Sequence, residues 1–269
     1  MKNLFLFLFL LVVFTSKAQD NRVSGLNSRQ FTKYWKVESE SPDYKVTFQG
    51  DTAEIVSPKG LTLWRKEKMS GKVTIEYDAC VVVESDGDRL SDLNCFWMAS
   101  DPQYPDNLWK REKWRSGIFL NCYSLQLYYL GYGGNHNSTT RFRRYDGDES
   151  GITNPKARPA ILKEYTDAGH LLKPNHWYHI KITNENNRVS YYIDGERLVD
   201  FRDAEPLREG WFGFRTTLSR TRITNFSYEC SSQEAAAVPL QWIGETPRQD
   251  KAVSFGVPFD KGEVFPENK

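Results

Sequence analysis

The feature that most constrains this chain is a succession of short segments in which apolar and polar side chains alternate. From Val73 to Ala79 the alternation has a period of two, which is the pattern of a strand with one buried face. Asp194-Gly195 separates two such segments and predicts a two-residue hairpin, because both residue types tolerate a positive φ. Further segments of this kind lie at 116–123, 124–132, 139–145, 177–183, 189–193, 196–200, 211–218 and 222–228. Many short strands and few helical patterns predict an all-β fold, a jelly-roll sandwich of two antiparallel sheets.

The two ends of the chain differ from this strand-rich middle. Residues 1–18 combine Lys2, an unbroken apolar run over 4–14 and a small-residue cleavage site at Ala18, which together form the pattern of a secretory signal peptide. The apolar run is too short to span a bilayer. We therefore expect a secreted or periplasmic protein without an integral membrane segment in its mature form. The β-jelly-roll domain is expected over 19–230, followed by a linker and tail over 231–269 that is rich in Pro, Gly and charge.

Charge and motif content weigh against several classes of protein. Lys and Arg total 36 against 35 Asp and Glu, so the basic excess of a nucleic-acid-binding protein is missing, and we expect no nucleic-acid partner. No phosphate loop, nucleophile elbow or dinucleotide fingerprint occurs, and we expect no cofactor.

The four cysteines are spaced too widely for a zinc motif, and we expect no metal site. Export permits disulfides, but each cysteine lies in an apolar run where a buried thiol is equally reasonable. The disulfide state of Cys80, Cys95, Cys122 and Cys230 therefore stays open.

The segment 139–145 carries the strongest hint of chemistry. In an extended strand Arg141, Arg143 and Tyr145 share one face, while Phe142 points to the core. Two guanidiniums beside a phenol suit the bidentate capture of a carboxylate or sulfate. The alternative is a solvated outer surface whose arginines pair with neighbouring acids.

The loop 131–137 precedes this segment and is rich in Gly and Asn, which permit unusual backbone angles. His136 in this loop is the candidate general base or acid, and Asn135 is a candidate donor to substrate. The alternative for His136 is a residue that caps the loop. The expected polar faces of other strands add candidate substrate-binding residues, namely Tyr128, Tyr132, Trp211, Arg215 and His179.

Several motifs resemble the concanavalin-A-like, or laminin-G-like, superfamily: 116–121, 173–178, Tyr192-Ile193-Asp194-Gly195 and 210–215. The segment from Tyr129 to Gly147 is more specific. It resembles an exported family of the polysaccharide-utilisation gene clusters of Bacteroidota. The resemblance covers residues 31–230 and implies a jelly roll that serves lyases, glycoside hydrolases and sugar-binding modules alike.

The family setting implies a lyase or dehydratase that acts by β-elimination on a uronic acid, as in ulvan degradation, and leaves a 4,5-unsaturated sugar. In that reaction Arg141 and Arg143 would neutralise the carboxylate, while His136 and Tyr145 would act as base and acid, or in exchanged roles. The expected partner is an acidic oligosaccharide or polysaccharide. A glycoside hydrolase with two carboxylates, or a non-catalytic module for acidic glycans, remains the alternative.

Overall fold

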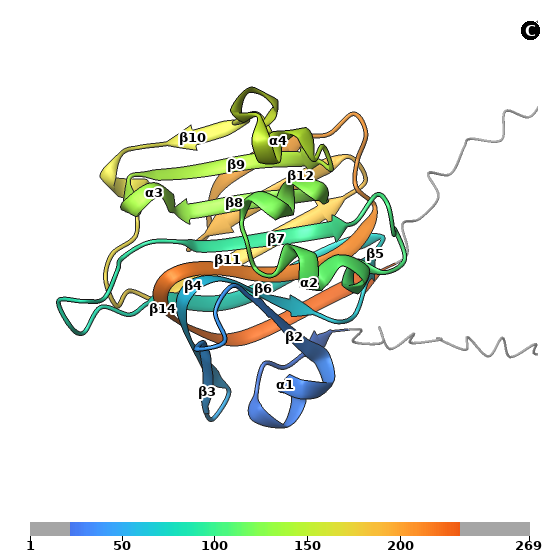
Figure 1. Cartoon of the computed structure of the whole chain (residues 1–269). Helices are drawn as coiled ribbons and strands as arrows, with labels where there is room; N and C mark the ends of the chain where they lie inside the picture. Colours follow the sequence, from blue (N-terminus) through green and yellow to red (C-terminus); the bar gives the residue numbers. More distant parts are fainter. Residues whose placement is uncertain (1–21, 232–269) are drawn as a thin grey trace, which may run out of the picture. The chain divides into compact units, whose positions relative to one another are not determined.

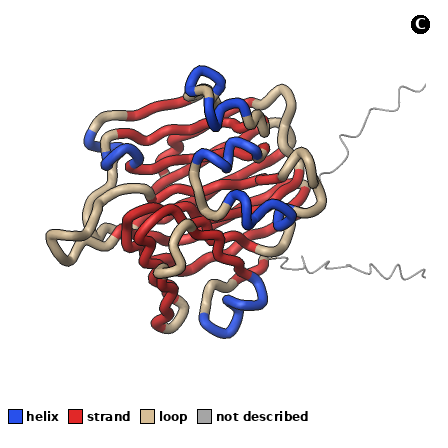
Figure 2. Tube along the Cα trace, viewed as in Figure 1, coloured by secondary structure: helices blue, strands red, loops and turns tan. Residues whose placement is uncertain are grey.

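The computed structural model describes residues 22–231 (Figure 1). The expected signal peptide and residues 232–269 of the expected tail lie outside the described residues. Strands dominate, with short helices at their ends and in the connections (Figure 2). Among the described residues, no helix is both long and apolar enough to cross a membrane.

The strands are β1 (Val23–Ser24), β2 (Trp35–Ser39), β3 (Lys45–Gln49), β4 (Thr52–Arg65), β5 (Met69–Ser70), β6 (Lys72–Val81), β7 (Leu93–Ser100), β8 (Gln126–Gly133), β9 (Thr139–Asp146), β10 (Lys163–Tyr165), β11 (Tyr178–Glu185), β12 (Arg188–Ile193), β13 (Glu196–Arg202) and β14 (Glu209–Ser231). The helices are α1 (Ser28–Tyr34), α2 (Glu112–Arg115), α3 (Gly134–Asn137) and α4 (Ser150–Thr153), with 3-10 turns η1 (Leu108–Arg111), η2 (Leu120–Ser124), η3 (Pro155–Ala157) and η4 (Ala168–His170).

Two layers form because β4 and β14 each bend from one layer into the other. The first half of β14 pairs with β7 and the second half with β6, while β4 accompanies β14 through both halves. The front sheet therefore has the order β10-β9-β8-β7-β14-β4-β2, and the back sheet runs from β14 through β6, β11 and β12 to β13 (Figure 1). The bend in β14 lies at Leu218, whose φ is 49° and where the register shifts. The sequence suggested two separate strands here, and the structure has one.

The main core fills the space between the two sheets. It contains alternate residues of β6 (Val73, Ile75, Tyr77, Ala79 and Val81), as their period of two predicted. The hairpin predicted between β12 and β13 is confirmed, since Asp194 and Gly195 have φ of 50° and 84°. All four cysteines are free thiols in the described structure.

A second hydrophobic cluster lies on the outer face of the front sheet, under residues 101–124, which we call the cap segment (Figure 1). Leu108, Cys122 and Tyr123 of the cap segment pack there against Trp64 and Tyr145 of the sheet. The strand expected over 116–123 is wrong. Ser116 and Gly117 have φ of 48° and 70°, which no strand allows, and the apolar residues that follow form η2 and cover the sheet instead.

Candidate functional site

A cleft of about 510 Å³ opens on the outer face of the front sheet, beside the cap segment. Its floor comes from β7, β8, β9 and the first half of β14, and its apolar wall from Ile118, Phe119 and Leu120 of the cap segment. The cleft is within the size range of small-molecule sites, and it is the main candidate site because it brings together Arg141, Arg143 and Arg215, which the sequence predicted as site residues.

One row of residues, which runs across the four strands, forms the floor of the cleft. Arg215 of β14 pairs with Asn94 of β7, Asn94 pairs with Gly131 of β8, and Gly131 pairs with Arg141 of β9. Neighbouring strands are about 4.8 Å apart, so the backbones at the two arginines lie roughly 14 Å apart. Because Gly131 has no side chain, the row is hollow near its middle.

Tyr129 occupies part of the space that Gly131 leaves. Its hydroxyl oxygen lies 2.2 Å from the position that a Cβ atom on residue 131 would take. Tyr129 also pairs across the sheet with Arg143 of β9. Burial, followed by the negative charge of Asp92, raises the pKa of the Tyr129 phenol above its ordinary value. The hydroxyl is therefore protonated at neutral pH and able to donate.

Each arginine on the floor is held by a partner that leaves most of its donors unused, because a guanidinium carries five N–H groups. Arg141 Nε donates to Glu164 Oε1 at 2.5 Å, and Arg215 Nη1 donates to the Gly117 carbonyl at 2.6 Å. Arg143 Nη1 donates to the carbonyl of Pro159. The side chains are thereby fixed in place and still able to bind an anion.

A fourth arginine and a buried carboxylate form one corner of the cleft. Arg89 Nη1 donates to Asp92 Oδ2 at 2.7 Å and to the Thr217 carbonyl at 2.9 Å. Asn94 Nδ2 donates to Asp92 Oδ1 at 3.2 Å, while Asn94 Oδ1 is buried without a hydrogen-bond partner among the described residues. The lining thus has four arginines against two carboxylates, Asp92 and Glu40, which favours an anionic ligand.

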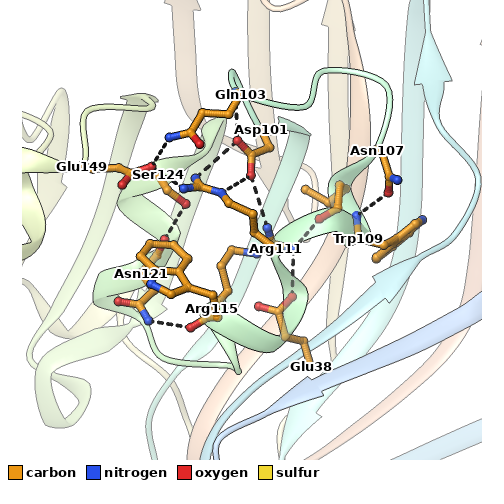
Figure 3. A network of polar contacts seen from close by, with 12 residues as sticks. Glu38, Asp101, Gln103, Asn107, Trp109, Arg111, Arg115, Asn121, Ser124 and Glu149 are labelled. Carbon is orange, nitrogen blue, oxygen red and sulfur yellow. Dashed lines mark hydrogen bonds and ion pairs between the residues drawn. The ribbon is translucent and has the colours of Figure 1, made fainter.

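The cap segment that forms the apolar wall is fixed by a buried charge network (Figure 3). Arg115 is fully buried, and its Nη2 donates to Glu38 Oε2 of β2 at 3.0 Å. Arg111 bonds Asp101 at 2.8 Å and Glu149 at 2.5 Å. Burial raises the pKa of the Glu38 carboxyl, and the Arg115 charge opposes that rise. The network joins the cap segment to β2 and to the loop after β9.

The predicted face of β9 is confirmed, since Arg141 and Arg143 line the cleft and Phe142 lies in the core. Tyr145 shares their face but is fully buried under the cap segment, 5.3 Å from the ring of Tyr123. Its hydroxyl has no hydrogen-bond partner within residues 22–231, and Tyr145 does not line the cleft. Tyr145 therefore cannot reach a ligand in this structure.

The predicted unusual backbone of the loop is also present. Asn135, His136 and Asn137 all have a positive φ, which makes a left-handed turn. Asn137 secures it by accepting from the backbone N–H of Leu172 at 2.8 Å and donating to the Leu172 carbonyl at 2.9 Å. Asn135 lines the cleft, whereas His136 is exposed beside it and is not among the lining residues.

The face predicted for Tyr128 and Tyr132 is wrong. Both rings lie in the main core between the sheets, while Leu127 and Tyr129 face outward. Tyr128 donates its hydroxyl to Asp203 at 2.6 Å. The alternation of residues along β8 predicted the wrong face because the cap segment also buries the outer face of this strand. Both faces of β8 are therefore apolar.

The remaining candidates divide between the two sheets. Arg215 lines the cleft, as expected of its strand face. Trp211 shares that face but is buried under the cap segment, where its Nε1 donates to the Lys66 carbonyl at 3.1 Å. His179 lies on the outer face of the back sheet and bonds Asp78 at 2.7 Å, so its expected place in the cleft is wrong.

Sequence reasoning missed Arg89, Asp92, Asn94 and Tyr129. The only sequence signal for Tyr129 was its membership of the segment 129–147. Asn94 lies in β7, which is buried on both faces and shows no alternation.

Residues 55–226 match the model of a family described as a domain of unknown function, DUF6250. The chain belongs to this family. No curated protein matches the DUF6250 chain.

Solved structures share the fold of this DUF6250 chain. A protein of unknown function with a galectin-like fold from Bacillus subtilis has a TM-score of 0.62 at 16% identity, covering 79% of this chain and 96% of its own. The exoplasmic/lumenal domain of VIP36, in a Ca²⁺/Man3GlcNAc-bound form, has a TM-score of 0.52 at 9% identity, covering 81% and 91%. The Emp47p carbohydrate recognition domain has a TM-score of 0.50 at 14% identity, covering 80% and 96%. At these identities the likeness shows the fold alone, and it confirms the predicted concanavalin-A-like sandwich.

Proposed function

We propose that this exported protein binds an acidic saccharide in the cleft and breaks the C4–O bond of a uronic acid by β-elimination. The reaction releases water or a sugar and leaves a 4,5-unsaturated ring, in the manner of a dehydratase or polysaccharide lyase acting on ulvan-type glycans. The observation that carries the proposal is the excess of arginines over carboxylates around the hollow at Gly131.

Elimination from a uronic acid requires its carboxylate to be neutralised, because the C5 proton is only weakly acidic beside a free anion. Arg141 and Arg143 lie on one face of β9 and are fixed by their partners, so a carboxylate between them would meet preorganised donors. Arg215, at the other end of the row, would bind a second polar or anionic group of a longer ligand.

The two proton transfers fall to Tyr129 and His136. His136 takes the C5 proton, the electron pair of that bond forms the C4=C5 double bond, and the C4–O bond breaks. Tyr129 protonates the leaving oxygen, in the role first expected of Tyr145. Burial and Asp92 raise the pKa of its phenol, and the charges of Arg215 and Arg143 oppose that rise and would stabilise the phenolate that forms. His136 belongs to the loop whose Asn135 already lines the cleft.

The fold supports a sugar as the ligand. Two of the similar structures are the Emp47p carbohydrate recognition domain and the exoplasmic/lumenal domain of VIP36 in a Ca²⁺/Man3GlcNAc-bound form. These relatives are too distant to assign chemistry to this cleft, so the acidic character of the ligand rests on the arginines.

The proposal is tested by incubating the mature protein with uronate oligosaccharides and following the ultraviolet absorbance of the new conjugated double bond. Arg141→Ala and Tyr129→Phe are expected to reduce the rate at least a hundredfold. Arg188→Ala is the matched control, because Arg188 is exposed on β12 and paired with Asp200. No absorbance with any of several acidic glycans would contradict elimination.

Recognition without turnover is the second candidate function, and it is favoured by the position of His136 outside the lining. In that case calorimetry would show binding of the uronate oligosaccharide, weakened by salt, and His136→Ala would leave it intact. Reducing ends without ultraviolet absorbance would instead indicate a glycoside hydrolase.

A further inference from the structure

A separate groove of about 410 Å³ lies on the outer face of the back sheet. It is lined by residues of β3, the first part of β4, the second half of β14 and Trp177, which directly precedes β11. Trp177 is 43% exposed, although its indole is large and apolar. Nothing in the proposed chemistry of the cleft uses this groove.

A cross-strand row forms the floor of the groove, as in the cleft. Thr47 pairs with Glu54, Glu54 with Arg222, and Arg222 with Cys80. Trp177 precedes the β11 residue that pairs with the neighbour of Cys80, which places the indole at the end of this row. Cys80, between Arg222 and Trp177 in this row, is almost fully buried and does not line the groove.

The charges in the groove balance one another. Arg222 Nε donates to Glu54 Oε2 at 2.7 Å, and Arg220 Nε lies 3.0 Å from Glu54 Oε1. The lining itself has one arginine and one carboxylate, Arg222 and Glu54. A groove with paired charges does not select an anion, in contrast to the cleft with its excess of arginines.

We propose that this groove is a second saccharide site and that it binds a neutral pyranose. The apolar face of the sugar ring would stack on Trp177, because an exposed indole offers a large apolar surface at little entropic cost. The sugar hydroxyls would bond the free lone pairs of Glu54, the spare N–H groups of Arg222 and the exposed amide of Gln49. The ion pair fixes the first two groups in place, so little freedom is lost on binding.

The rest of this sheet face explains why the site is confined to the groove. Beyond Cys80 the outward side chains of β6 and β11 bond to one another, with His179 on Asp78 at 2.7 Å and Lys181 on Glu76 at 3.0 Å. These pairs lie outside the lining of the groove.

The test is a titration of the full mature protein with neutral gluco-, manno-, galacto- and xylo-oligosaccharides, followed by tryptophan fluorescence and calorimetry. Binding of at least one series is expected, weakened at least tenfold in Trp177→Ala and largely restored in Trp177→Phe. Trp114→Ala is the matched control, since Trp114 is equally exposed but lies on the cap segment, and it should bind as the wild type does. If Trp177→Ala does not fold, Gln49→Ala, which alters an exposed side chain, should still weaken binding.

Absence of binding throughout the neutral panel would overturn the proposal, as would binding that Trp177→Ala leaves unchanged. Uronate binding or turnover in the cleft should be the same in Trp177→Ala and the wild type. Failure of the cleft chemistry and failure of this site are therefore separate results.

Discussion

The outer faces of the two sheets carry similar residues and use them in different ways. On the front sheet Arg143 and Arg215 are held by backbone carbonyls, and the cap segment covers the face around them. On the back sheet Arg222 is held by the carboxylate of Glu54, and no cap segment covers the face. Under the two proposals, the same sandwich binds an anionic ligand on its front face and a neutral ligand on its back face.

The difference is one of degree, because Arg141 in the cleft is also paired with a carboxylate, that of Glu164, while Arg143 and Arg215 are held by carbonyls alone. A carbonyl fixes the guanidinium without cancelling its charge, whereas a carboxylate cancels it. Polar residues on alternate strand positions look alike in sequence on both sheets, and only the fold reveals which of them remain charged toward a ligand.

The largest expected effect comes from removing the anchor of the cap segment. Arg115→Ala leaves Glu38 buried without its partner, and we expect the free energy of unfolding to fall by about 3–5 kcal/mol. Chemical denaturation measures this, with the exposed Arg188→Ala as a control that should behave as the wild type does. Uronate binding should weaken while binding in the Trp177 groove persists. A loss of stability no larger than that of the control would show that the front face does not depend on its cover.

The second-largest effect is expected from filling the hollow at Gly131. The Cβ atom of Gly131→Ala would meet the hydroxyl of Tyr129, and we expect a loss of about 1–3 kcal/mol of stability and at least tenfold weaker uronate binding. Gly87→Ala is the control, because nothing lies within 4 Å of its Cβ position. Calorimetry of both variants measures the effect, and unchanged binding in Gly131→Ala would place the ligand elsewhere.

Lowering the pH is expected to weaken the ion pairs on the outer face of the back sheet. Burial alone would raise the pKa of Glu54, but hydrogen bonds from Arg220 and Arg222 lower it overall, and the bond from Lys181 lowers that of Glu76. Because these folded-state pKa values lie below the ordinary glutamate value of about 4.3, the stability they contribute is complete above that pH and is lost as the pH falls further. The two pairs should contribute about 0.2–1 kcal/mol each. The free energy of unfolding, measured by chemical denaturation between pH 7 and roughly pH 3, should therefore fall less steeply with decreasing pH in the double variant Glu54→Gln/Glu76→Gln than in the wild type. Equal slopes would count against this role.

The smallest effect is expected at Tyr145. Its hydroxyl is buried without a partner in the described part of the chain, so Tyr145→Phe should break no hydrogen bond and should change stability by less than about 0.5 kcal/mol. Its turnover of uronate oligosaccharides should equal that of the wild type, whereas Tyr129→Phe loses activity. A rate defect in Tyr145→Phe would return the acid role to that residue.

The strands whose orientation could be predicted from the sequence are those with only one buried face. The alternation of β9 placed Arg141 and Arg143 on one face and Phe142 on the other, as the structure has them. In β8 the same reasoning reversed the faces, because the cap segment buries Tyr129 and Leu127 almost as fully as the core buries Tyr128.

The parts of the site that could not be predicted depend on contacts between distant segments. Asp92 becomes a site residue only because Arg89, Ser91 and Asn94 bond to it at the end of β7. Residues 116–123 of the cap segment looked like a strand because they are rich in apolar residues, and no local pattern distinguishes a strand in a sheet from a segment that covers the sheet.

The passage of β14 from one sheet into the other has a consequence for how the protein melts. A single strand of 23 residues carries Arg215 toward the cleft and Arg222 toward the Trp177 groove, and its hydrogen bonds extend into both layers. Neither layer can detach without stripping the same strand from the other. The sandwich should therefore unfold cooperatively, with both binding activities vanishing at one midpoint.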